Sequence, residues 1–547
     1  MTTAAIVAAV VVFLLITLPP NPIPASWTGD PSIPSRTVAG AYHVHTTRSD
    51  GAGDRAAVAA AAKRAGLQFV LLTDHGDGTE IAAPAYVDGI LCVDGVEIST
   101  NGGHYVALGM APAPYPLGGE PFAVIEDVTR LGGFGIAAHT DSPKPSLVWT
   151  DWDVPFDGLE WLNADTEWRN ESRVRLTRAM FDYLLRPGPA LASVLDRPDA
   201  TLARWDGLAT RRPVIALAGH DAHGGVGTTS EDGQRRSVGG VPSYEASFRT
   251  FSTRVVLDRP LSGEADGDAR ALLAAIRAGH TFTAVDALAG PGFIDFQGRQ
   301  GERRGPMGST FSAGTGIIEV TATMPEGAQL VAIGRGKPLR QLGEAHYLTG
   351  LENFSGAIRV EVRLPGAPGN PPIPWLVSNP LYFLPPAARP ADVDSRTYEP
   401  ADLSWKVEKP LGSDGDLAGS EQDVSLDFRL RQGERASQFV ALAGDFRGPR
   451  RTATAIAFDG VASRPMRVSV QLRYPSGGGE RWARSVYLDT SQRHVVVPLD
   501  HMLPVDHQTG SAPSIATAKT LLFVVDLVNA SPGSSGTFRV ANVTLGR

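Results

Sequence analysis

Two histidines one residue apart, His43 and His45, end an apolar run near the start of the chain, and Asp50 follows five residues later. Side chains of residues i and i+2 in a β-strand point to the same face, so the two imidazoles can bind one cation together. Asp50, in the loop that follows, can reach a neighbouring cation. A histidine pair that stands alone on a strand is more often structural. The pattern therefore predicts a metal site only if other parts of the chain supply further ligands.

Further residues of the metal-ligand type lie at or next to the ends of other apolar runs. They are Asp74, His75, Glu97, His104, His139, His220, Asp221 and His223. Helical patterns at residues 54–65 and 121–131 separate several of these runs, and Asp54 suits an N-cap. Strands that alternate with helices indicate a parallel sheet or barrel, whose functional residues gather at the C-terminal ends of the strands. We therefore expect these side chains to meet, and mixed imidazole and carboxylate ligands suit Zn, Mn or Fe better than Mg alone.

The order and spacing of these residues resemble the motifs of the polymerase and histidinol phosphatase (PHP) family of metal-dependent phosphoesterases. The stretch from His43 to Gly51 matches the family's opening motif, HxHTxxSDG, letter for letter. The later motifs are matched by Thr73-Asp74-His75, Gly95-Val96-Glu97, the lone His139 and Asp221-Ala222-His223. The resemblance covers residues 37–290, about half of the chain. It implies an α/β fold, a distorted (β/α)7 PHP barrel with a cluster of three metal ions at its mouth.

The resemblance also implies a role for each of these residues. The first metal would be held by His43, His45, Glu97 and Asp221. Glu97 would bridge to a second metal held by His104 and His139. The third metal would be held by Asp50, His75 and His223. Asp74 and His220 are the candidate catalytic residues, with the expected role of orienting the ligands.

A reaction class follows from this resemblance. Two divalent ions about 3.5–4 Å apart can generate a bridging hydroxide and offset charge on a phosphoryl oxygen and on the leaving group. The implied enzyme is a phosphoric ester hydrolase in which metal-bridged water attacks a phosphomono- or phosphodiester in line. Because no serine or cysteine nucleophile is required, we expect no phospho-enzyme. The expected substrate is a phosphorylated small molecule or glycan.

Composition limits the remaining functions. A chain of 547 residues is too long for one core and suggests about three domains. The net charge of −8 gives no basic surface for nucleic acid, so no nucleic-acid partner is expected. The single cysteine, Cys92, cannot form an internal disulfide.

The N-terminus contains a continuous apolar run, Ala4 to Leu18, followed by a proline-rich stretch. Its 15 residues fall short of the roughly 20 that a spanning helix needs, and they suit the apolar core of a signal peptide. We interpret residues 1–36 as a signal peptide or N-terminal membrane anchor with a proline-rich tether. The expectation is export to a bacterial periplasm or cell envelope, with membrane tethering as the alternative.

A long segment between His139 and Asp221 contains five tryptophans, which either fill a core or line a substrate cleft. They are Trp149, Trp152, Trp161, Trp168 and Trp205. Residues 157–163 read as a strand and residues 171–185 as a helix. Lys144, Arg169 and Arg48 are candidate phosphate partners, because a cationic fork complements an oxyanion. Solvation at the surface is the more common explanation for any one such cation.

After about residue 290 the helical patterns end and alternating apolar and polar runs begin. We expect two all-β sandwich domains, a small one at 291–390 and a jelly roll at 391–547, following a barrel at 37–290. The last domain loosely resembles galactose-binding-like carbohydrate-binding modules, on its strand order and its ending from Gly536 to Leu545. Trp482 and Tyr487 could stack on sugar, although alternating aromatics in a sandwich are more often core.

The leading hypothesis is therefore an exported metal-dependent phosphoesterase with two appended β-sandwiches. The alternative is a non-catalytic, metal-stabilised cell-envelope protein that binds polysaccharide through its C-terminal domain. A third hypothesis keeps hydrolysis but directs the same cluster at a non-phosphate bond.

Overall fold

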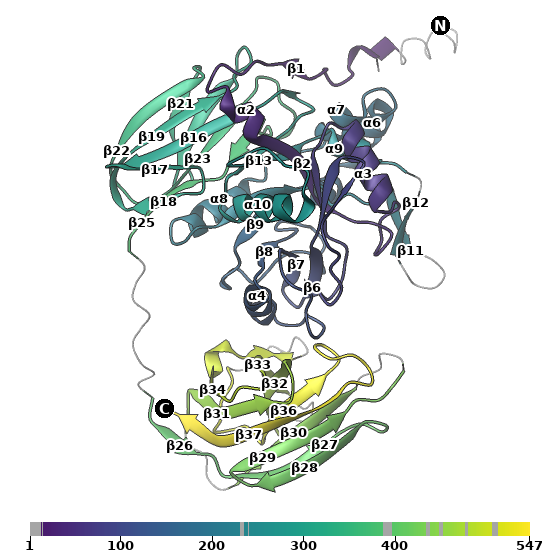
Figure 1. Cartoon of the computed structure of the whole chain (residues 1–547), viewed down its shortest axis with the longest axis vertical. Coiled ribbons are helices and arrows are strands. Elements are labelled where there is room, and N and C mark those ends of the chain that lie inside the picture. Colours follow the sequence, from purple (N-terminus) through teal and green to yellow (C-terminus); the bar gives the residue numbers. More distant parts are fainter. Residues whose placement is uncertain are drawn as a thin grey trace. The chain divides into compact units, whose positions relative to one another are not determined.

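The computed structural model describes residues 12–13, 15–229, 235–238, 240–386, 396–433, 438–447, 452–475, 480–505 and 512–547 (Figure 1). The chain divides into two compact units, which are described separately below. The first comprises Met1–Gly76, Glu80–Ala111 and Val128–Ala387, and the second comprises Asp77–Thr79, Pro112–Asp127 and Ala388–Arg547.

One part of the first unit is a parallel arrangement of apolar strands. β2 (Thr37–Val44), β3 (Phe69–Leu72) and β5 (Ile90–Asp94) pair in parallel, and β4 (Ala85–Val87) adds an antiparallel edge. Helix α3 (Arg55–Arg64) connects β2 to β3, and its N-cap Asp54 accepts a hydrogen bond from the backbone of Ala57, as the sequence predicts. Every residue of β2, β3 and β5 is buried, which explains their near-continuous apolar sequences.

A second sheet follows in the order β10-β9-β8-β7-β6. Its strands are β6 (Val96–Thr100), β7 (Gly103–Leu108), β8 (Phe134–Ala137), β9 (Gly158–Asn163) and β10 (Ile215–Gly219). β8, β9 and β10 are parallel, but β6, β7 and β8 pair antiparallel, which differs from the expected parallel alternation. For β6 and β7 the reason is local: only two residues separate these strands, and a connection of this length permits only a hairpin.

Both edge strands of the second sheet, β6 and β10, adjoin strands of the first sheet. On one side β5 continues into β6 through Gly95 alone. On the other side the backbone N–H of His220 donates to Tyr42 O at 2.9 Å and that of Ala222 donates to His43 O at 3.2 Å. An apolar core that includes Tyr42, Phe69 and Leu217 fills the space between them. The ends of β2, β6, β8 and β10 are thereby brought close together.

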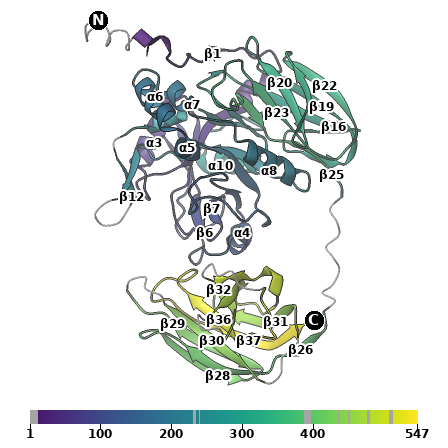
Figure 2. The ribbon, with the colours of Figure 1, turned by 180° about the vertical axis from the view of Figure 1, so that it is seen from behind.

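The segment between β9 and β10 is helical and includes the predicted helix at 171–185 (Figure 2). Its helices are α5 (Ala164–Asn170), α6 (Arg173–Tyr183), α7 (Pro187–Ala192) and α8 (Asp199–Ala209). Three of the tryptophans of this region are fully buried and belong to the core, namely Trp149, Trp161 and Trp205. Trp168, in α5, is half-buried.

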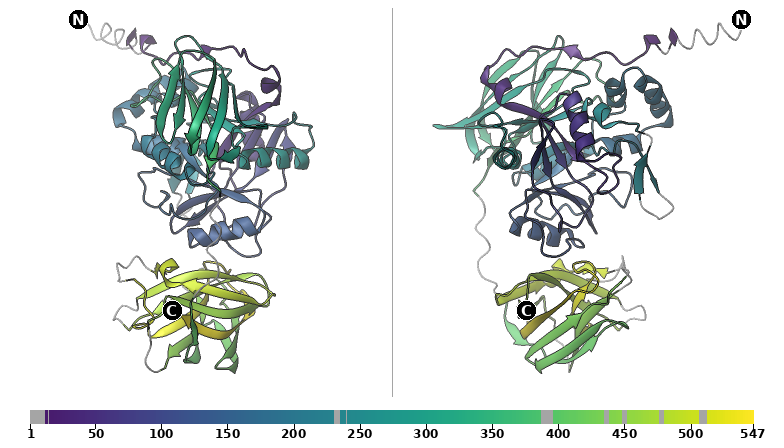
Figure 3. Two further views of the ribbon diagram at one scale, coloured as in Figure 1. Left: turned by 90° about the vertical axis from the view of Figure 1, so that its left-hand side faces the viewer. Right: turned by 45° about the vertical axis from the view of Figure 1, so that its right-hand side comes forward.

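Residues 291–386 share a sheet with the strands that precede them. β13 (Ser252–Val256) pairs with β2 and with β14 (Thr281–Ala284), and β14 pairs with β24 (Leu376–Ser378). The sheet continues through β23 (Gly356–Arg363), β25 (Leu381–Leu384) and β18 (Thr310–Ser312). β20 (Gln329–Gly334) also pairs with β23, and β21 (Lys337–Leu342) pairs with β20. The region expected as a separate small sandwich therefore continues a sheet of the preceding region (Figure 3, green strands).

The remaining elements of the first unit complete its surface. A four-stranded sheet contains β16 (Ile294–Gln300), β17 (Arg303–Pro306), β19 (Gly314–Ala322) and β22 (His346–Phe354). Two short pairs are β1 (Ile23–Pro24) with β15 (Ala289–Gly290), and β11 (Val226–Thr229) with β12 (Arg235–Val238). The other helices are α2 (Ser32–Arg36), α9 (Tyr244–Phe248) and α10 (Ala265–Arg277). Most of the N-terminal apolar run, at residues 1–11 and 14, lies outside the described residues.

The second unit contains two six-stranded antiparallel sheets around one apolar core, which makes it a β-sandwich. One sheet contains β26 (Tyr398–Pro400), β28 (Asp414–Ser420), β29 (Asp423–Arg429), β31 (Ala455–Ala462), β34 (Arg493–Pro498) and β37 (Ser535–Gly546). The other contains β27 (Leu403–Glu408), β30 (Phe439–Phe446), β32 (Met466–Arg473), β33 (Arg481–Leu488), β35 (Leu503–Pro504) and β36 (Thr520–Asp526). Its helical elements are α4 (Pro121–Arg130), most of which falls in this unit, and the 3-10 turn η1 (Leu499–His501). Within the described residues, no helix has the length and apolarity that crossing a bilayer requires.

Candidate metal centre

The structure brings all nine predicted ligands together at the junction of the two sheets. Within each of four groups, one ligand atom from each residue lies within 4.8 Å of the others. The groups are His45, Asp50, His75 and His223; His43, Glu97 and His139; His43, His45 and Asp221; and His75, Glu97 and His104. Asp50, His75 and His223, which are expected at the third metal, lie together in one group. His43, His45 and Asp221, which are expected at the first metal, lie together in another.

Glu97, on β6, lies at the centre of the arrangement. Its Oε1 accepts hydrogen bonds from His104 Nδ1 at 2.6 Å and His139 Nε2 at 3.0 Å. Its Oε2 lies 3.1 Å from His75 Nδ1 and 3.3 Å from both His43 Nε2 and His45 Nε2. The carboxylate is fully buried and belongs to two of the four groups. This position between two groups suits a carboxylate shared by two cations.

Several buried polar atoms of these ligands lack a hydrogen-bond partner among the described residues. They are His43 Nε2, His45 Nε2, His75 Nδ1, Glu97 Oε2 and His139 Nδ1. Buried polar atoms are almost always paired, and an unpaired one costs free energy. Five such atoms from one cluster are explained if a cation accepts their lone pairs. The donor set, imidazole nitrogens with carboxylate oxygens, fits Zn, Mn or Fe.

The backbone at three ligands adopts the left-handed region that non-glycine residues rarely occupy. His43, His139 and Asp221 have φ angles of 63°, 50° and 46°. His43 is the second-last residue of β2, and His139 and Asp221 each lie two residues beyond the end of a strand, β8 and β10. Strain of this kind costs of order 1–3 kcal/mol per residue and is concentrated at functional sites.

The imidazoles and carboxylates of the cluster stabilise one another's charges. Burial alone raises the pKa of Glu97, but the surrounding imidazoles, His75 and His43 foremost, hold it well below its ordinary value. Burial likewise opposes charge on His45, yet Asp221 and Glu97 raise its pKa to about 10. The carboxylates are therefore ionised, as metal coordination requires, and cation binding must displace protons from the imidazoles.

Sequence reasoning assigned no role to Glu160, which lies in the strand predicted at residues 157–163. The side chain of Glu160, on β9, is fully buried and accepts three hydrogen bonds. The donors are His43 Nδ1 at 2.6 Å, the backbone N–H of His139 at 2.8 Å and Asn163 Nδ2 at 2.8 Å. In a neutral His43 this bond keeps the proton on Nδ1, so that the Nε2 lone pair is available to a cation. A carboxylate that fixes a ligand histidine in this way raises its affinity for metal.

The two candidate catalytic residues bind the backbone and loop around the ligands. Asp74 accepts from Thr46 N at 2.7 Å, from Ser49 Oγ at 2.7 Å and from the guanidinium of Arg48 at 3.0 Å, so it holds the loop after His45. Arg48 is committed to this ion pair and to Asp94, which leaves less of its charge for a phosphate than the sequence suggested.

His220 lies deeper in the fold than Asp74. Its Nε2 lies 2.8 Å from the backbone oxygen of Phe251, and its ring stacks on the Phe251 ring with a centroid distance of 4.2 Å. Burial lowers the pKa of His220 to about 4, so its imidazole is neutral near pH 7. These contacts hold β10 and the segment around Phe251 in place.

A cavity of about 250 Å³ adjoins the cluster. The ligands Asp50, Asp221 and His223 line one part of it. The rest of the lining is largely apolar and includes Trp168, Leu191, Val194, Leu195, Pro242 and Phe251. Arg169 also lines the cavity and forms an ion pair with Asp165, a further lining residue. The cavity can therefore accept a ligand that combines an apolar group with an anionic one.

No protein-family model and no curated protein matches the chain. Solved structures similar to it include the family 11 carbohydrate-binding module of a cellulosomal cellulase of Clostridium thermocellum, at 16% sequence identity and a TM-score of 0.23, covering 28% of this chain and 97% of that chain. A family 29 carbohydrate-binding module mutant complexed with mannohexaose is similar at 14% identity and a TM-score of 0.18, covering 28% of this chain and 93% of that chain. At TM-scores in this range the similarity carries no inference about a ligand.

Proposed function

We propose that the chain is a metal-dependent phosphoesterase whose site is the cluster around Glu97. The observation that carries this proposal is the convergence of nine ligand-type side chains, five of which present a buried atom without a hydrogen-bond partner among the described residues. Divalent ions held there would supply an activated water and positive charge opposite a developing oxyanion.

We propose further that residues 37–290 form the PHP barrel that the motifs suggest. The hydrogen bonds from His220 and Ala222 to β2 support this proposal, because they close the strands into a ring. The antiparallel β6, β7 and β8 make that ring a distorted one.

The residues around the cluster have separate tasks in this proposal. Glu160 keeps the proton of His43 on Nδ1, and Asp74 holds the loop that carries Asp50. The cavity binds the substrate: its apolar wall, with Trp168 and Leu195, excludes water from the organic part of an ester. Arg169, although paired with Asp165, lies where it can contact an anionic group.

The test is hydrolysis of p-nitrophenyl phosphate and bis-p-nitrophenyl phosphate by the metal-loaded chain. We expect His43→Ala to abolish turnover and His494→Ala to leave it unchanged, because His494 is exposed in the second unit and pairs with Asp459. The preferred ester would show whether the enzyme is a mono- or diesterase. Full metal loading without turnover of either ester would contradict the proposal.

A second candidate is the non-catalytic protein that binds polysaccharide through residues 391–547. Trp482 packs against the core of the sandwich, and Tyr487, an odd number of residues further along β33, points to the opposite face. These two aromatics therefore do not form one stacking platform. Titration with mannohexaose and mixed-linked β-glucan tests this candidate, since binding of either without ester hydrolysis would favour it.

We also propose that the chain is exported, on the N-terminal apolar run. Fractionation of the producing cells tests this, because recovery of the chain in the cytoplasm alone would contradict it.

A further inference from the structure

Helix α6 and the two residues that follow it carry an exposed apolar surface. Leu184 is 79% exposed and Val174 is 80% exposed, and Met180, Phe181 and Leu185 are exposed as well. At about 100° per residue, Val174 and Phe181 fall within about 20° of each other on the helix. Leu184 and Leu185 directly follow its end. We call these five residues the α6 face. A cluster of large exposed apolar side chains on a soluble unit marks an interaction site.

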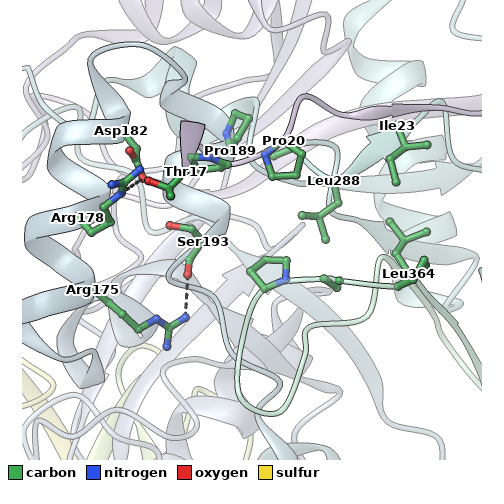
Figure 4. A pocket seen from close by; sticks show the side chains of 16 residues that line it. Thr17, Pro20, Ile23, Arg175, Arg178, Asp182, Pro189, Ser193, Leu288 and Leu364 are labelled. Carbon is green, nitrogen blue, oxygen red and sulfur yellow. Dashed lines mark hydrogen bonds and ion pairs between the residues drawn. The ribbon is translucent and has the colours of Figure 1, made fainter. Parts of the chain in front are cut away.

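The last described residues of the N-terminal apolar run lie beside this helix. The guanidinium of Arg186, just after α6, donates to the carbonyl oxygen of Pro19. A cavity of about 360 Å³ is lined by Thr17, Pro20 and Ile23 and by Arg175 and Arg178 of α6. Figure 4 shows Thr17 next to Arg178, and Ile23 at the other end of the cavity near Leu364. The described residues that precede Thr17 are also apolar and exposed, namely Val12, Phe13, Leu15 and Ile16.

The charges around the α6 face are largely compensated. Arg175 pairs with Glu171 and Asp196, and Arg178 pairs with Asp182 at 2.8 Å. Arg173, at the start of α6, is exposed. Electrostatic attraction to an anionic surface is therefore a minor contribution, and burial of the apolar side chains must dominate binding at this face.

We propose that the α6 face docks on the surface of a lipid bilayer. The helix would lie in the interfacial plane with its apolar side chains at the boundary of headgroups and acyl chains, and the N-terminal run would enter the same bilayer beside it. An exposed apolar helix face beside the exposed Val12, Phe13, Leu15 and Ile16 favours this partner over a single protein groove, because a bilayer buries both at once. α7 lies between this region and the metal centre, since Pro189 lines the cavity next to α6 and Leu191 lines the cavity next to the ligands.

Site-specific labelling of the full chain separates α6 from the N-terminal run. The single natural cysteine, Cys92, is fully buried, so a cysteine introduced by Leu184→Cys can be labelled selectively with an environment-sensitive fluorophore. The matched control is Leu348→Cys, an exposed leucine on β22 of the same unit. Each labelled chain is mixed with vesicles of phosphatidylcholine containing phosphatidylglycerol.

We expect the label at 184 to shift to the blue, to gain at least about twofold in intensity, and to be quenched by brominated lipids. The label at 348 should show none of these changes. High salt should weaken the signal only slightly, because the arginines are paired.

Two outcomes would overturn the proposal. Chain that sediments with vesicles while the label at 184 is unchanged would show that the N-terminal run binds alone. A label at 184 that is already shifted to the blue without lipid would show that the chain's own N-terminus or a second copy covers α6. Dependence of that shift on protein concentration would identify the second copy.

Discussion

Replacing Glu160 by glutamine should weaken metal binding although Glu160 itself is not a ligand. The carboxylate accepts from His43 Nδ1 through Oε1, and from His139 N and Asn163 Nδ2 through Oε2. A glutamine has one oxygen and one NH2 group, so its NH2 must face a donor on one side. If it faces His43, the imidazole proton moves to Nε2. That nitrogen lies 3.3 Å from Glu97 Oε2 and is the one that would bind a cation.

The size of the effect follows from this geometry. Loss of a carboxylate that orients a ligand histidine lowers metal affinity by about 10–100-fold, which corresponds to about 1.4–2.8 kcal/mol. The cost of the mismatched amide, about 1–3 kcal/mol for an unsatisfied buried group, falls on the same part of the fold and should also lower its stability.

Competition with a chelator of known affinity measures the metal Kd of Glu160→Gln directly. Glu361→Gln is the matched control, because Glu361 is equally buried but pairs with Arg359, away from the cluster. We expect the control to lose stability and to keep its metal Kd. A folded Glu160→Gln chain that binds metal within twofold of the wild type would refute the positioning role.

Three further predictions concern the first unit. Arg359→Met should destabilise the fold by about 3–5 kcal/mol in chemical denaturation, because it leaves Asp206 and Glu361 buried without their cation; a loss below about 1 kcal/mol would contradict this. Although burial opposes its charge, Arg359 and two neighbouring arginines lower the pKa of Glu361 to about 2, below its ordinary value of 4.5. The stability from this ion pair is therefore fully present above about pH 4.5 and is lost as the pH falls toward 2, so the fall in Tm across this window should be smaller in Glu361→Gln. Trp168→Ala should raise the KM for aryl phosphates with metal content unchanged, because Trp168 lines the cavity beside the ligands; an unchanged KM would remove Trp168 from the substrate site.

The ligands could be predicted from the sequence because each is tied to a local pattern. An apolar run followed by histidine or an acid places that side chain at a strand end, and this signal located His43, His139 and Asp221 at the ends of β2, β8 and β10. The N-cap of α3 was also predictable, since it depends only on Asp54 and the residues that follow it.

Features that depend on contacts between distant residues could not be predicted in the same way. Glu160 and His43 lie 117 residues apart, so no local pattern indicates their hydrogen bond. The pairing of β14 with β24 likewise joins Phe282 to Ser378, and it makes one sheet of what the change in sequence pattern near residue 290 suggested were two domains. The helix α7 is only six residues long and contains two prolines, so its sequence shows no helical pattern.

The most direct test of the metal centre is the metal content of the purified full chain, measured by inductively coupled plasma mass spectrometry for the wild type, Glu97→Ala and His494→Ala. The convergence of the ligands around Glu97 predicts about two to three Zn, Mn or Fe ions per chain in the wild type and in His494→Ala, and at most one in Glu97→Ala. A wild-type chain that binds no transition metal after exposure to all three ions would contradict the account.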